Sequence, residues 1–168
     1  MISLLQLRLK EHLSAALAWI KLYGQSDRGD VTTSPQVFIG DIPPKRKNTP
    51  DRTVREVPCV VIVPLSGHIE VEDGAATSVA LIALSCCVYN PDREENGDVT
   101  GVESDLANLV SAVCAALLPC AEGEPLARRF VLVPDEKGKT LAWVRPEEQP
   151  GPFASATITS RWHFKGWE

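Results

Sequence analysis

The sequence predicts an α+β fold in a single domain, with two main helices packed on one face of an antiparallel or mixed β-sheet. Amphipathic segments at residues 1–23 and 100–118 predict the two helices. Apolar or alternating runs between and after them predict the strands. Because the helices do not alternate with single strands, the order helix, strands, helix, strands favours α+β over a parallel α/β fold.

The size and charge of the chain limit its function. A chain of 168 residues can bury roughly 70% of its unfolded surface, so neither a disulfide nor a metal is needed for folding. No internal repeat or linker divides residues 1–168 into two domains. The formal net charge of −5 disfavours a dedicated nucleic-acid-binding protein, which usually carries a basic surplus, although DNA could pass nearby without binding.

Cysteine content and the N-terminal segment predict an intracellular protein. An odd number of cysteines in a chain of this length is unlike a secreted disulfide framework and favours buried free thiols in a reducing cytosol. Arg8, Lys10 and Glu11 interrupt the apolar start, as a signal peptide would not allow. No uncharged apolar run reaches the ~18 residues of a membrane span. The cysteines are Cys59, Cys86, Cys87, Cys114 and Cys120.

The first helix is expected over residues 1–23. Ser3 and Gln6 have the spacing of a capping box, and Gly24 offers a helix stop. Residues 25–34 are expected to form a loop and residues 36–40 a short strand. The apolar stripe of the helix comprises Leu5, Leu9, Leu13, Ala16, Leu17 and Ile20.

A proline-rich basic loop is predicted at about residues 41–57. Loops of this length in compact domains are often functional. Two interpretations stay open: a solvated loop, or a contact arm for an acidic neighbouring subunit or for DNA. The basic side chains of this candidate partner interface are Lys45, Arg46, Lys47, Arg52 and Arg55.

Three strands are expected next, at residues 58–63, 68–71 and 77–89. The last two are joined by a turn at Asp73-Gly74, a pair suited to positive φ. The third strand is apolar in both alternate sets, which indicates that both of its faces are covered. Adjacent Cys86 and Cys87 should point to opposite faces.

The second helix is expected after a polar turn at residues 90–99. Thr100 and Glu103 have capping-box spacing, and Pro119 ends the apolar stripe. The stripe comprises Val102, Leu106, Leu109, Val110, Val113 and Leu117.

The C-terminal third is expected to form three strands. Residues 129–133 and 140–144 should pair as a hairpin around the turn 134–139. Apolar and polar side chains alternate along residues 154–164, which predicts a strand with one face exposed to solvent. Its parity places Trp162 in the core, whereas Trp167 in the tail is a candidate anchor on a partner.

No motif predicts a catalytic, cofactor-binding or metal-binding residue. Gly138-Lys139-Thr140 lacks the first glycine of a P-loop and precedes an expected strand rather than a helix. The histidines have no metal-ligand spacing to a cysteine, and the acidic cluster at Glu70, Glu72 and Asp73 lies in an expected hairpin turn. The sequence leaves open a Cys–His pair that meets only in space.

One segment resembles small proteins of tailed phages. An aromatic residue ends a strand and is followed by a Pro-Asp turn, Tyr89-Asn90-Pro91-Asp92; a turn at Asn96-Gly97-Asp98 then leads into a helix containing Leu106-Ala107-Asn108-Leu109. The runs Val57 to Val63 and Gly67 to Glu70, and the order of elements along nearly the whole chain, are similar to that group. The family is that of the phage tail terminator and neck (head-tail joining) proteins, including the lambda-like tail terminator.

The resemblance implies a structural protein of a phage or prophage virion that performs no catalysis. Such proteins form closed rings, commonly hexamers, that cap the tail tube and contact the head connector. The implied partners are other copies of this chain, the tail tube protein and the connector. DNA would pass through without specific binding, and no membrane is involved. The implied location is the host cytoplasm during assembly and then the tail or neck of the virion.

Two other functions remain as alternatives. The first is a different virion component, either a head-completion or a tail-tube subunit. The second is a small-molecule-binding or enzymatic α+β domain, which would need a concave pocket with convergent polar groups.

Overall fold

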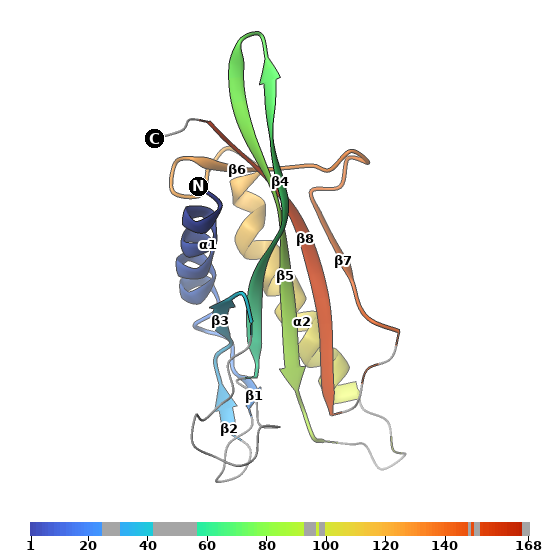
Figure 1. Cartoon of the computed structure of the whole chain (residues 1–168). Helices are drawn as coiled ribbons and strands as arrows, with labels where there is room; N and C mark the ends of the chain where they lie inside the picture. The colour runs from blue at the N-terminus through green and yellow to red at the C-terminus, as the bar shows by residue number, and fades with distance from the viewer. Residues whose placement is uncertain are drawn as a thin grey trace.

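The computed structural model confirms the α+β fold (Figure 1). It describes residues 1–24, 31–41, 57–92, 97, 100–147, 149 and 152–165. In this part of the chain, a six-stranded mixed sheet carries both main helices on one face, and a separate two-stranded ribbon lies near one end. The side chains between helices and sheet form one large hydrophobic core.

The sheet is built around two long central strands. β4 (Cys59–Glu72) and β5 (Ala75–Tyr89) form a hairpin, and β8 (Phe153–Lys165) pairs antiparallel with β5. β3 (Gln36–Ile39) confirms the short strand expected at residues 36–40, and it pairs parallel with β4. On the other side of β8 lie β6 (Phe130–Val133) and β7 (Leu141–Val144). The order is β3-β4-β5-β8-β6, with β7 also paired to β8.

Two sequence predictions about strands are wrong. The runs expected at 58–63 and 68–71 are one strand, because a bulge between Pro64 and Ser66 keeps β4 paired with β5. The expected hairpin of residues 129–133 and 140–144 does not form, since β6 and β7 each pair with β8. β8 has 13 residues, long enough to hold the two four-residue strands one after the other.

α2 buries its whole predicted stripe, and α1 buries part of its own. α1 spans Ile2–Ala16, and α2 spans Thr100–Leu117, followed by the short 3-10 helix η1 (Leu118–Cys120) with Pro119 inside it. Every residue of the predicted α2 stripe is buried. On α1, the buried positions include Leu5, Leu9 and Leu13.

The predicted helix boundaries and caps need correction. α1 ends at Ala16, and residues 22–24 form β1 (Leu22–Gly24), which pairs with β2 (Val31–Thr33) in the segment expected to be a loop. The residue that caps α1 is Met1, without a side-chain hydrogen bond, so Ser3 does not form the expected capping box. The carboxylate of Glu103, near the start of α2, accepts hydrogen bonds from Arg145.

The alternation of β8 is confirmed on its buried face. Trp162 is completely buried, and its indole Nε1–H donates to Ser160 Oγ at 2.9 Å. Ser160 Oγ–H in turn donates to the backbone oxygen of Ile82 at 3.1 Å, so both buried polar side chains are satisfied. The remaining core positions of the strand are Ala154, Ala156, Ile158 and Phe164.

The opposite sheet face is covered only in part. A small cluster of Val57, Cys59 and Val61 is buried at one end, with Cys87 and Tyr89 packed against it. Cys86 lies in the main core instead, which confirms that the adjacent cysteines point to opposite faces. None of the five cysteines, all of which are described, forms a disulfide.

Candidate assembly surface: the projecting hairpin arm

The most prominent surface feature is a hairpin that projects beyond the helices (Figure 1). We call residues 64–82 the arm. Pairing of β3 with β4 ends at Ile62, and pairing of β8 with β5 ends where Lys165 meets Thr77. Among the described residues, β5 is therefore the only strand that pairs with β4 beyond Ile62, and the other edge of β4 forms no strand pairing there.

The base of the arm is fixed against α1. Gly67 allows this close approach, because a Cβ at this position would lie 3.1 Å from Ile2 Cδ1 and 3.2 Å from the oxygen of Val79. The register continues without a break from Ser66 to the tip, where Glu72 faces Ala75. The arm is therefore an ordered extension of the sheet.

Aliphatic side chains are exposed along the arm. Leu65 is 54% exposed, Ile69 48% and Val71 70%. A groove of about 570 Å³ lies between the start of α1 and the inner side of the arm; its lining includes Met1, Ile2 and Ile69. An open strand edge with exposed aliphatic side chains is a site that other chains can bind.

The outer side of the arm carries a polar network. Glu70 accepts hydrogen bonds from His68 and from Arg161 Nη2, each at 2.9 Å. The hydrogen bond from His68 and the charge of Arg161 hold the pKa of the Glu70 carboxyl below its usual value. The predicted acidic cluster thus lies in a hairpin, and this ion pair ties the arm to β8.

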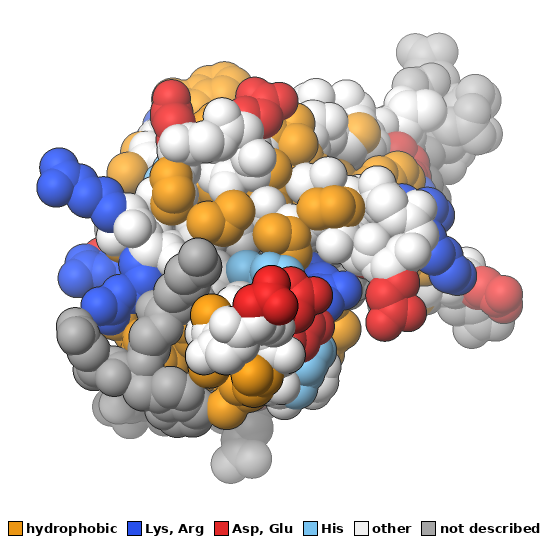
Figure 2. Space-filling view, turned by 90° about the horizontal axis from the view of Figure 1, so that it is seen from above, with side chains coloured by type: hydrophobic (Ala, Val, Ile, Leu, Met, Phe, Trp, Pro, Cys, Tyr) orange, Lys and Arg blue, Asp and Glu red, His pale blue; other side chains and the backbone are white. Residues whose placement is uncertain are grey.

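The tip of the arm is an acidic turn. Asp73 and Gly74 both have positive φ, 48° and 79°, which confirms the predicted turn. Glu72 and Asp73 are exposed there. Figure 2 looks down on this end of the molecule and shows acidic side chains at the centre, with hydrophobic ones beside and around them.

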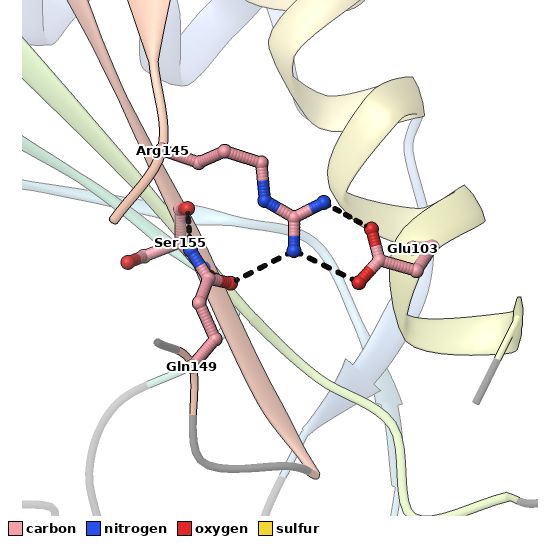
Figure 3. A network of polar contacts seen from close by, with 4 residues as sticks. All are labelled: Glu103, Arg145, Gln149 and Ser155. Atoms are coloured by element: carbon pink, nitrogen blue, oxygen red, sulfur yellow. Dashed lines mark hydrogen bonds and ion pairs between the residues drawn. The ribbon is translucent and has the colours of Figure 1, made fainter. Parts of the chain in front are cut away.

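A second polar network joins α2 to the loop before β8 (Figure 3). Both terminal N–H groups of Arg145 donate hydrogen bonds to the carboxylate of Glu103. Nη2 of Arg145 also donates to Gln149 Oε1 at 3.4 Å. Gln149 Nε2 donates to the backbone oxygen of Ser155, and the backbone N–H of Ser155 donates to Gln149 Oε1. The pKa of Glu103 is lowered by the hydrogen bond from Arg145. The network links α2 to the segment that leads into β8, so a structural role explains it.

The predicted interface residues fall mostly outside the described part of the chain. This holds for Trp167 and for all five basic residues of the 41–57 loop, so their role stays a prediction. The 134–139 turn is described: Asp135 Oδ1 accepts from the backbone N–H groups of Lys137 and Lys139, both at 2.8 Å. A strand follows this turn, as predicted, which a P-loop would not have.

Sequence reasoning did not identify the arm as a surface. The gap expected between the strands at 58–63 and 68–71 contains Pro64 and Gly67, which the structure accommodates beside a bulge and in a close contact with α1. The sequence does contain a signal for the arm. Aliphatic residues such as Ile69 and Val71 alternate with charged residues beside a tight turn, which is typical of an exposed hairpin.

The described residues hold no group of three or more His, Cys, Asp or Glu side chains arranged to bind a metal ion. Burial raises the pKa of the Cys86, Cys114 and Cys120 thiols, which lowers their reactivity. A hydrogen bond with Cys59 lowers the pKa of the Cys87 thiol instead. The segment Thr100–Cys120 is long and apolar enough to cross a membrane, but its apolar stripe packs in the core.

Comparisons with known proteins give no further assignment. No protein-family model matches the chain, and no curated protein matches it significantly. Its function is therefore inferred from its own residues and surfaces.

Proposed function

We propose that this protein is a structural subunit of a tailed phage or prophage that assembles into a closed ring, capping the tail tube and joining it to the head connector. In this proposal the ring has six copies, the protein is not an enzyme, and DNA passes through the ring without specific binding. The arm is the observation that supports this function best, because it is an ordered projection with an open edge and exposed aliphatic side chains.

A closed ring requires two different surfaces on each subunit that bind each other head to tail. A projecting arm suits one of these surfaces, since it extends past the body of its own subunit (Figure 1). Ile69 and Val71 have large exposed fractions and would be buried by a neighbouring copy. Burying such side chains supplies the main driving force for association.

In the described part of the segment that resembles tail terminators, Asn90 ties the end of β5 to α2. Asn90 is 5% exposed; its Nδ2 donates to Asp105 Oδ2 at 2.9 Å, and its Oδ1 accepts from the backbone N–H of Asp92 at 3.0 Å. Gly101 packs closely on it, since a Cβ there would lie 3.0 Å from Asn90 Nδ2. These bonds hold the end of β5 against α2.

Deleting the gene from its genome of origin tests the proposed role. We expect the deletion to give tails of irregular length that are not joined to heads, and we expect a wild-type copy supplied on a plasmid to restore complete virions. Normal infectious virions from the deletion would contradict the proposal. Heads that lack DNA beside normal tails would instead indicate a head-completion subunit.

A further inference from the structure

A strained turn presents two arginines next to β6. Ala127 and Arg128 both have positive φ, 51° and 59°, although neither is a glycine, asparagine or aspartate. The turn is held by hydrogen bonds from the backbone N–H groups of Arg129 and Phe130 to the oxygen of Leu126, at 3.1 and 3.0 Å. Strained backbone of this kind is concentrated at functional sites.

The turn borders a groove of about 470 Å³, which is lined by residues of β6 and of the end of β8. Arg128 and Arg129 lie at its edge, and Val131, Val133 and His163 also line it. In the described part of the chain, neither arginine takes part in an ion pair. His163 Nε2 is buried and has no hydrogen-bond partner among the same residues. Within the described residues, the groove thus combines positive charge that has no ion-pair partner with an aliphatic surface.

The tip of the arm has the complementary chemistry. Glu72 and Asp73 are exposed and form no ion pair with another described residue, and Val71 beside them is 70% exposed. Continuous pairing up to Glu72 and Ala75 keeps the arm extended, so its tip points away from the body (Figure 1). The acidic tip is therefore placed to reach another molecule.

We propose that the arm tip of one copy docks into the arginine groove of the next, with Glu72 and Asp73 facing Arg128 and Arg129. Val71 then packs on the valines of the groove. The tip and the groove are different surfaces, so the contact is head to tail and repeats around a ring. This inference rests on the proposed function, since it names the surfaces through which the ring would form.

Charge-changing variants test this contact. We expect Arg128→Asn/Arg129→Glu to weaken self-association at least tenfold, and Glu72→Arg/Asp73→Asn to do the same, in dilution series by sedimentation velocity. Asparagine tolerates positive φ, so both variants should stay folded, as circular dichroism would verify. The two variants mixed in equal amounts should assemble again, because each tip then meets a groove of opposite charge in an alternating ring.

The remaining outcomes separate the two proposals. Arg8→Glu/Lys10→Asn on α1 changes the net charge by the same amount and should leave assembly unchanged. If wild-type protein self-associates but the two variants match it, or if mixing them restores nothing, this contact is wrong while the ring can stand. If wild-type protein stays monomeric at every concentration, the proposed function itself is wrong.

Discussion

Replacing the exposed aliphatic side chains of the arm should weaken ring assembly without affecting the fold. We consider Ile69→Thr/Val71→Thr. Threonine is β-branched and suits a strand, so the monomer should unfold at nearly the same denaturant concentration. In the proposed ring, however, the two side chains lose apolar surface that a neighbouring copy would bury.

The magnitude follows from their exposure. Full burial of a valine or isoleucine side chain is worth about 1.5–3 kcal/mol. Ile69 is 48% exposed and Val71 70%, so together they have roughly one full side chain left to bury. The double substitution should therefore cost about 2 kcal/mol at each contact, or about a 30-fold increase in the dissociation constant.

Sedimentation velocity over a dilution series measures this change. Val144→Thr is the matched control, because Val144 is 66% exposed on β7, outside the arm. The reasoning is refuted if the arm variant associates as tightly as the wild type, or if the control weakens association equally.

Three further predictions concern folding stability, each measured by urea denaturation. Ser160→Ala should cost about 1–3 kcal/mol, because the buried Nε1–H of Trp162 loses its acceptor; an unchanged midpoint would contradict this. Gly74→Ala should cost about 1 kcal/mol, since alanine is strained at φ 79°. Glu103→Gln should cost under about 1 kcal/mol, because its pair with Arg145 is exposed. The lowered pKa of Glu103 means that this difference is present at neutral pH and disappears as the pH falls through that pKa.

Local periodicity carried most of the correct predictions. The α2 stripe and the alternation of β8 are regular enough that each position could be placed on its face, including Trp162. The turn at Asp73-Gly74 was predictable because few residue pairs tolerate two positive φ angles.

The sequence analysis failed where the local structure depends on residues that are far away in the sequence. The ion pair of Glu103 with Arg145, 42 residues away, has no signal in the local spacing. β6 and β7 each have the length of a hairpin strand, yet the long edge of β8 offers both of them a better partner. The arm was missed for the same reason: only the lengths of β3 and β8 show where β4 and β5 are left without neighbours.

The mass of the native assembly tests the central claim most directly. Native mass spectrometry of the purified protein should show a closed oligomer, at about 110 kDa for six chains of 18.3 kDa, and electron microscopy should show a ring with a central pore. A protein that remains at 18.3 kDa at every concentration, and inside assembled tails, would contradict the account.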